Sequence, residues 1–223
     1  MADLFNSPVL LIEQPSSQLN YQITDPQGAP LAHVTQVAGN LPKSGFAQFF
    51  SDAPDRSRAV VRVDRPDGTP LFFVDRADGG PVSVQQPPCA VVAPDGQLIG
   101  RVEHNTAEFA QSLLQGGALG RRGGTFHQAH QLLDAQQQPL CRITWEDVER
   151  RPLPSGFEQS SRSVGGRFAV YTDMNGTQVA RMDTLDSDGA ADRFSLQLNF
   201  QLPEPMRTLV IASPLALDLM PGS

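Results

Sequence analysis

Apolar and polar residues follow one another in short runs along most of the chain, and polar turns separate the runs. The repeated form is an apolar run, a turn rich in proline, aspartate, asparagine or glycine, and a second apolar run. Five stretches have this form, at 21–31, 60–71, 91–99, 132–143 and 168–180. Proline presets φ, aspartate and asparagine bond to their own backbone, and glycine accepts positive φ, so each stretch predicts a β-hairpin.

The spacing of these turns distinguishes between β architectures. Successive turns lie about 30 or about 40 residues apart, and this uneven spacing disfavours a propeller or solenoid with a fixed repeat. Strands at 9–13 and 194–202 bring the total to about twelve, and an open sheet of that size usually curls, closes or splits into two layers. We therefore predict an all-β fold, a closed antiparallel β-barrel of about twelve strands.

The last part of the chain combines a strand pattern with a helix pattern. From Asp192 to Leu202, apolar and polar residues alternate, which predicts a strand with one buried face. The segment 203–220 would be apolar on nearly every side of a helix, and such a helix must be surrounded by protein or lipid. Its apolar part is shorter than the ~20 residues that span a bilayer. We predict a central helix buried inside the barrel, in which Pro214 removes one backbone hydrogen bond.

Composition fits one domain over residues 1–223. A hydrophobic content of 39% supports one sizeable core, and a net charge of -7 argues against general nucleic-acid binding. The N-terminal residues show no secretion signal. Cys89 and Cys141 have neither a zinc-ligand spacing nor a disulfide framework. These features predict a cytoplasmic protein.

Short motifs in a particular order link the chain to a known family. They are the opening strands at 11–14 and 21–23, the glycine turn and strand at 94–102, the strand at 192–202, and the helix residues at 206–207 and 217–220. In order, spacing and placement they resemble the phospholipid scramblase family, within the wider tubby C-terminal-like group. The resemblance implies a twelve-stranded barrel threaded by the C-terminal helix.

The same resemblance implies a function at membranes. It points to a scramblase-related protein that interacts with anionic phospholipid or a membrane surface, peripheral at the cytoplasmic membrane face, with phospholipid scrambling as the implied activity. The alternatives are a tubby-like module that binds phosphoinositide or another anionic ligand without transport, and a barrel used only for protein contacts. The chain lacks the proline-rich arm and cysteine clusters of the animal members, so membrane contact would be reversible.

Motifs for catalysis are missing from the sequence. It contains no GxSxG elbow, Walker loop, GxGxxG after a strand, or HExxH. We therefore expect neither an enzyme nor a resident cofactor. Two arginine pairs are candidates for lipid phosphates, because guanidinium groups suit phosphate oxygens: Arg121 with Arg122, and Arg150 with Arg151. Neither pair belongs to a polybasic run, so a solvated loop is the competing interpretation of each.

An acidic stretch near the last strand is the candidate calcium site. Asp186, Asp188 and Asp192 fall on positions three, five and nine of an EF-hand spacing that starts at Thr184. The first position is not acidic, and Ser195 stands at position twelve instead of glutamate. In scramblases an acidic segment at the last strand resembles a calcium loop, and only Asp192 is retained here. A solvated acidic loop is therefore favoured over calcium binding.

The histidines offer no shared metal site in sequence. His127 and His130 lie three residues apart, so on a strand they point to opposite faces. His33 and His104 stand alone, and we expect them to be ordinary strand or loop residues.

Overall fold

The computed structural model describes residues 3–15, 19–39, 58–78, 87–105, 129–147, 167–185 and 193–220. These ranges contain twelve strands and one helix. In chain order they are β1 (Val9–Glu13), β2 (Tyr21–Thr24), β3 (Pro30–Gly39), β4 (Ala59–Asp64), β5 (Pro70–Arg76), β6 (Cys89–Val92), β7 (Leu98–His104), β8 (Ala129–Asp134), β9 (Pro139–Asp147), β10 (Arg167–Asp173), β11 (Gln178–Leu185), β12 (Arg193–Leu198) and α2 (Met206–Leu219).

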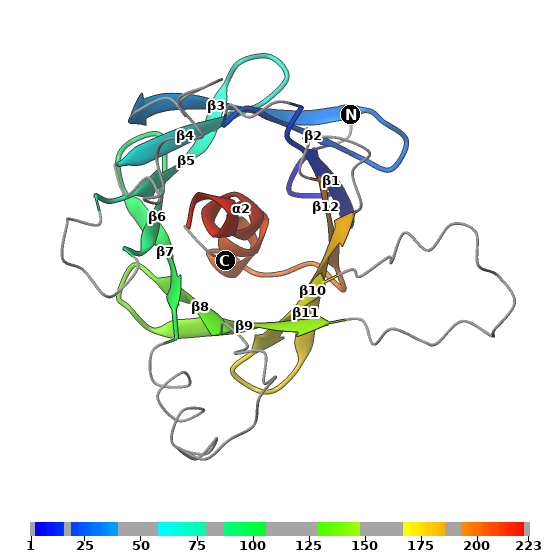
Figure 1. The fold of residues 1–223 in the computed structure, drawn as a ribbon, viewed down its shortest axis with the longest axis vertical. Coiled ribbons are helices and arrows are strands. Elements are labelled where there is room, and N and C mark those ends of the chain that lie inside the picture. Colours follow the sequence, from blue (N-terminus) through cyan, green and yellow to red (C-terminus); the bar gives the residue numbers. More distant parts are fainter. Residues whose placement is uncertain are drawn as a thin grey trace, which may run out of the picture.

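The strands form a closed antiparallel barrel. Each strand pairs with its neighbours in the chain, and β12 returns to pair with β1, from Val9 opposite Gln197 to Glu13 opposite Arg193. In Figure 1 the strands form a ring and α2 lies inside it. The predicted fold class, a twelve-stranded antiparallel barrel around a C-terminal helix, is confirmed.

Five tight turns mark one end of the barrel, which we call the turn end. They join β2 to β3, β4 to β5, β6 to β7, β8 to β9 and β10 to β11, and they are the five hairpins that the sequence predicts. In the first turn, the amide of Gly28 donates to the carbonyl of Asp25 at 2.9 Å, and the Asp25 carboxylate accepts from the amide of Ala29 at 2.8 Å. Four of the turns have a glycine with positive φ at the corresponding position, and the fifth has Gln137, with φ of 63°. The opposite end of the barrel, where β1, β3, β5, β7, β9 and β11 finish, is called the far end.

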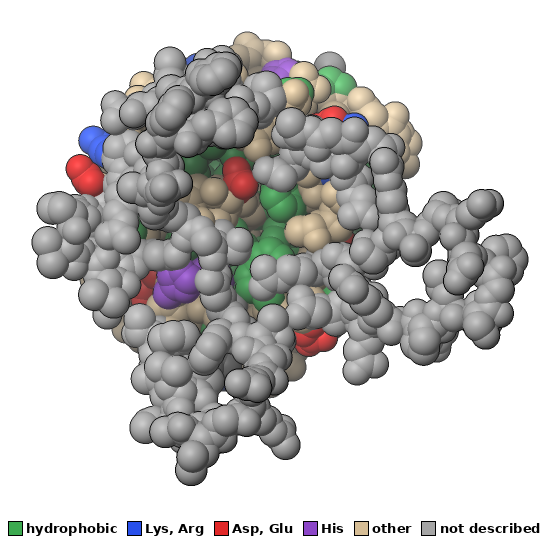
Figure 2. Space-filling view, in the orientation of Figure 1, with side chains coloured by type: hydrophobic (Ala, Val, Ile, Leu, Met, Phe, Trp, Pro, Cys, Tyr) green, Lys and Arg blue, Asp and Glu red, His purple; other side chains and the backbone are tan. Residues whose placement is uncertain are grey.

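The barrel interior and α2 form one hydrophobic core. Alternate residues of each strand point inward, and α2 is buried along almost its whole length from Thr208 to Leu219. Figure 2 shows hydrophobic side chains in the middle of the ring that surrounds α2. The helix runs from the turn end to the far end. Near its start it approaches β7 so closely that a Cβ on Gly100 would lie 2.8 Å from a methyl carbon of Leu209. No helix within the described ranges is long and apolar enough to cross a membrane.

The bounds of the last strand and the helix differ from the prediction. The strand ends at Leu198 instead of Leu202, and Phe200, expected on the buried face, is 48% exposed. The ladder ends there because β1 begins at Val9, and the amide of Leu198 already bonds to the carbonyl of Pro8. The chain then turns into the barrel, and the helix starts at Met206 instead of 203.

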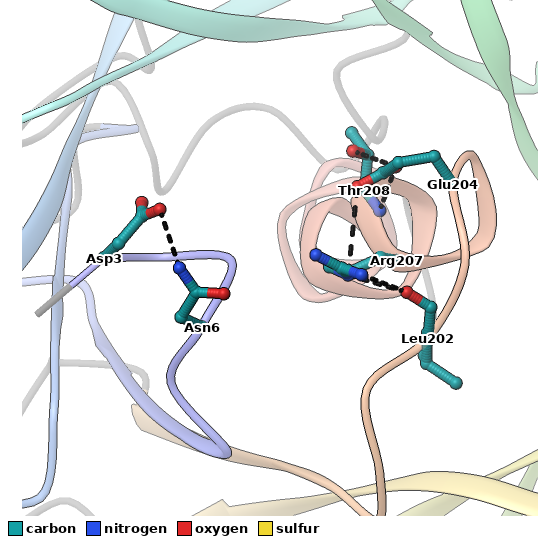
Figure 3. Close-up of polar contacts among 6 residues, drawn as sticks. All are labelled: Asp3, Asn6, Leu202, Glu204, Arg207 and Thr208. Carbon is teal, nitrogen blue, oxygen red and sulfur yellow. Dashed lines mark hydrogen bonds and ion pairs between the residues drawn. The ribbon is translucent and has the colours of Figure 1, made fainter.

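Side chains hold the start of α2 in place. The Arg207 guanidinium donates from Nε to the Leu202 carbonyl at 2.7 Å. The Thr208 hydroxyl donates to the Glu204 carboxylate at 2.7 Å. Figure 3 shows these contacts beside the N-terminal segment, where the Asn6 amide donates to Asp3 at 3.2 Å. The Arg207 bond satisfies the carbonyl of Leu202, which lies after β12 and before α2.

The far end of α2 is held by residues from the barrel wall. Arg76 of β5 points into the lumen and donates from Nη1 to the carbonyl of Leu219 at 2.5 Å. The last turn of α2 contains no basic residue, so Arg76 supplies the positive charge that favours a helix C-terminus. The Tyr21 hydroxyl of β2 donates to the carboxylate of Asp218.

Candidate functional site

The site residues chosen from the sequence lie outside the described ranges. These are the four arginines and three aspartates predicted for phosphate and calcium: Arg121, Arg122, Arg150, Arg151, Asp186, Asp188 and Asp192. Both assignments therefore stay predictions. His127 also lies outside these ranges.

A groove lies on the outer surface of the barrel, over β5, β6 and β7 toward the far end. Its volume is about 380 Å³. Among the described residues it is lined by Arg58, Asp75, Ala77, Asp78, Pro88, Ala90 and Arg101. The strand register places Asp75 opposite Ala90, and Ala90 opposite Arg101, so these three side chains form a row across neighbouring strands. The row faces outward because it alternates with buried positions such as Val74 and Val102.

An ion pair forms one side of the groove. The Arg58 guanidinium donates to both oxygens of the Asp75 carboxylate, from Nε at 3.0 Å and from Nη2 at 2.6 Å. The bond to Asp75 raises the pKa of Arg58. The pair is accessible to solvent, with 61% of the Arg58 side chain and 25% of the Asp75 side chain exposed. Asp75 is therefore neutralised locally, while Arg58 keeps donor capacity toward solvent.

Arg101 lies on the other side of the groove, across Ala90 from the ion pair. Its guanidinium has no hydrogen-bond or ion-pair partner within the described part of the chain. Between the two arginines the floor is apolar, formed by Ala77, Pro88 and Ala90. An unpartnered guanidinium beside an apolar floor is suited to an anion that brings an apolar portion with it.

The charged groups in the described lining of the groove are two arginines and two aspartates. Its described lining has no cysteine, serine, histidine or lysine. The two thiols are elsewhere: Cys89 and Cys141 lie inside the barrel, and burial raises the pKa of each to about 12. Both are therefore protonated at neutral pH and poor nucleophiles. The described residues contain no group of three or more side chains suited to holding a metal ion.

His104 is a strand residue, as expected, but in space it does not stand alone. His104 ends β7 and lies directly opposite His130 of β8, and their ring centroids are 4.2 Å apart. Sequence spacing missed this pair because it tests neighbours in the chain, whereas the strand register decides which residues meet. It also missed the groove, whose lining comes from three strands and the segments beside them.

Comparisons of the chain with protein-family models, with curated proteins and with solved structures gave no match. The resemblance to the scramblase and tubby-like group therefore stays a prediction from short motifs.

Proposed function

We propose that the protein is a peripheral binding module that holds the phosphate of an anionic phospholipid headgroup in the outer groove, without moving the lipid across the membrane. The observation that carries the proposal is the Arg101 guanidinium, which has no partner among the described residues and lines the same groove as the exposed Arg58, with an apolar floor between them. This is the tubby-like alternative of the sequence analysis, with a different set of arginines.

The chemistry of the groove suits a phosphate group. A guanidinium presents donors in a fixed fork that matches two phosphate oxygens, and such charge-assisted bonds are stronger than neutral ones. Arg101 can donate without breaking an existing bond, and Arg58 can donate its remaining N–H groups while it stays paired with Asp75. The groove volume of about 380 Å³ lies within the usual range for small-molecule sites.

The charges also predict that binding is local and reversible. The chain carries a net charge of -7, so its overall field repels an anionic surface. Within the groove, the two arginines are balanced by Asp75 and Asp78. The attraction must therefore come from direct contact, and a basic residue close to an anionic surface contributes about 1 kcal/mol. We expect weak membrane binding that salt reduces.

The position of α2 favours binding over lipid transport. The helix fills the barrel, and its apolar side chains pack against the inward-facing residues of the strands. Withdrawal of α2 toward lipid would expose that apolar lining to water, which is unfavourable. Binding at the outer groove requires no such rearrangement.

Co-flotation with vesicles tests the proposal. The full-length protein is mixed with phosphatidylcholine vesicles, with phosphatidylserine vesicles and with phosphoinositide vesicles, each with calcium and with a chelator. We expect flotation with the anionic vesicles only, and competition by soluble inositol phosphate if the headgroup alone is recognised. Absence of flotation with every composition would refute membrane binding and leave protein contacts as the alternative.

A pair of arginine variants locates the binding surface. Arg101→Gln removes the charge from the groove, and we expect about five-fold weaker partition onto anionic vesicles, which corresponds to about 1 kcal/mol. Arg142→Gln is the matched control, because Arg142 is an exposed arginine on β9 that does not line the groove. Equal losses in the two variants would show that general charge, and not the groove, determines binding.

A further inference from the structure

Two histidines meet inside the barrel wall at the far end. His104 is the last residue of β7, and the register of the β7–β8 pair places it directly opposite His130. The two ring centroids are 4.2 Å apart and the ring planes are inclined by 37°. His130 points into the interior, on the same face of β8 as the fully buried Leu132.

The ring nitrogens of His130 make no hydrogen bond within the described part of the chain. The residue is 0% exposed, and neither Nδ1 nor Nε2 has a hydrogen-bond partner there. A neutral imidazole carries one donor and one acceptor, and each buried polar group that stays unsatisfied is costly. A histidine is therefore an unfavourable choice for this position unless something binds its ring.

A proton is a poor occupant of this position. Burial lowers the pKa of His130 to about 3, with the neighbouring His104 as the second cause, and burial also lowers the pKa of His104. Burial therefore disfavours the charged form of both rings.

We propose that His104 and His130 together bind a divalent transition-metal ion of the class that prefers imidazole, such as Zn²⁺ or Cu²⁺, through one ring nitrogen of each residue. The site is independent of the groove and of the proposed lipid binding.

Coordination by both residues requires the His104 ring to turn, because nitrogen lone pairs lie in the ring planes and two stacked rings inclined by 37° do not aim them at one point. With metal–nitrogen distances of ~2.0–2.1 Å, two imidazoles on one tetrahedral ion have ring centres ~5 Å apart. The observed separation of 4.2 Å is about 1 Å less, and His104 is only half-buried, so its ring can turn toward the ion. Within the described residues no group of three or more side chains could hold a metal ion, so the proposed site has two protein ligands there. Two protein ligands predict a site much weaker than a structural zinc site.

Metal titration tests the assignment on the full chain after treatment with a chelator. Calorimetry with Zn²⁺ and with Cu²⁺ should give one ion per chain, and the Cu²⁺ complex should show nitrogen hyperfine coupling in its electron paramagnetic resonance spectrum. Saturating Zn²⁺ should raise the thermal unfolding midpoint by about 5 °C, because the ion binds only the folded pairing of β7 with β8.

Histidine variants decide whether this pair is the site. His104→Gln and His130→Gln should each weaken metal binding at least ten-fold, whereas His33→Gln should not, because His33 is exposed on β3. His104→Gln provides the test if the buried His130→Gln variant fails to fold. The proposal is wrong if the wild type does not saturate at millimolar metal, which would indicate that water satisfies the rings, or if His104→Gln binds metal as the wild type does.

Discussion

Replacing Ser213 by alanine tests how the barrel accommodates a proline within its central helix. Pro214 has no backbone N–H, so the carbonyl of Val210 lacks the helical donor it would otherwise have. The Ser213 hydroxyl donates to that carbonyl at 2.7 Å. The same oxygen is 2.8 Å from the hydroxyl of Tyr171, and since serine has one hydroxyl proton, Tyr171 is the donor there. Burial raises the pKa of Tyr171, which keeps that proton in place.

The expected magnitude follows from the two groups that lose a partner. Ser213 and Tyr171 are both 0% exposed, so no solvent replaces the missing bonds. Ser213→Ala leaves the Val210 carbonyl unsatisfied, at ~1–3 kcal/mol, and leaves the Tyr171 hydroxyl with only a weak thioether acceptor, Met182 Sδ at 3.9 Å, at a smaller cost. We expect the free energy of unfolding to fall by about 2–5 kcal/mol.

A second substitution identifies the cause of that loss. Pro214→Ala restores a backbone N–H that can donate to the Val210 carbonyl. In the Pro214→Ala background, only the Tyr171 hydroxyl loses its partner when Ser213 becomes alanine. The effect of Ser213→Ala should therefore be smaller there by about 1–2 kcal/mol.

Urea unfolding of the four proteins of this double-mutant cycle provides the measurement. Tryptophan fluorescence reports the transition, because Trp145 is buried in the barrel core. Equal m-values would confirm that the variants unfold from the same compact state. Ser213→Ala could lower the free energy of unfolding by the same amount with and without Pro214. That result would show that the Ser213 hydroxyl does not replace the helix bond that Pro214 removes.

Three further predictions concern the barrel wall. Gly100→Ala should lower the free energy of unfolding by about 3 kcal/mol or more, because its Cβ would lie 2.2 Å from the Leu133 carbonyl oxygen; a urea midpoint equal to that of the wild type would contradict this contact. Gln137→Gly should raise the free energy of unfolding by about 0.5–1 kcal/mol, because Gln137 has positive φ; Gln136→Gly, in the same turn, should give no such gain. His130 has a folded-state pKa of about 3, below its unfolded value of ~6.5. The stability that comes from keeping this ring neutral is therefore complete above pH ~6.5. As the pH falls toward 3, the free energy of unfolding decreases by up to about 1.4 kcal/mol per pH unit. Thermal melts from pH 7 to pH 4 should show this slope, and His130→Leu should reduce it.

The hairpins were predictable because their information is local. Turn residues such as Asp25 and Gly28 act on their own backbone, and the bonds observed in the turns are those that this chemistry predicts. Closure of the barrel also followed from the strand count and from an apolar C-terminal helix that needed to be surrounded. The hairpin that contains Gln137 was also predictable, although its turn has no glycine. The Asp134 carboxylate accepts a hydrogen bond from the amide of Gln138, as the aspartates of the other turns do from theirs.

The end of the last strand was not predictable from alternation alone. Phe200 continues the apolar pattern of β12, yet it lies beyond the point where β1 can pair. The pattern predicts which face a residue would take if the strand continued. Whether the strand continues depends on where the partner strand begins, and that partner is almost the whole chain away.

The groove and the histidine pair were missed for a related reason. Asp75, Ala90 and Arg101 come from three strands, and His104 of β7 meets His130 of β8 through the register of those two strands. Motif searches compare residues at short, fixed spacings. Sites assembled by sheet register have no such spacing.

Hydrogen–deuterium exchange of the full-length protein, with and without anionic vesicles, distinguishes lipid binding at the outer groove from release of α2. We predict that vesicles slow exchange in the described segments that line the groove, at 75–78 and 88–90 and around Arg101. The amides of α2 should exchange as slowly as in the free protein, because the helix stays inside the closed barrel. Faster exchange in α2, with no protection at the groove, would contradict the account, since it would show that the helix leaves the barrel when the protein meets lipid.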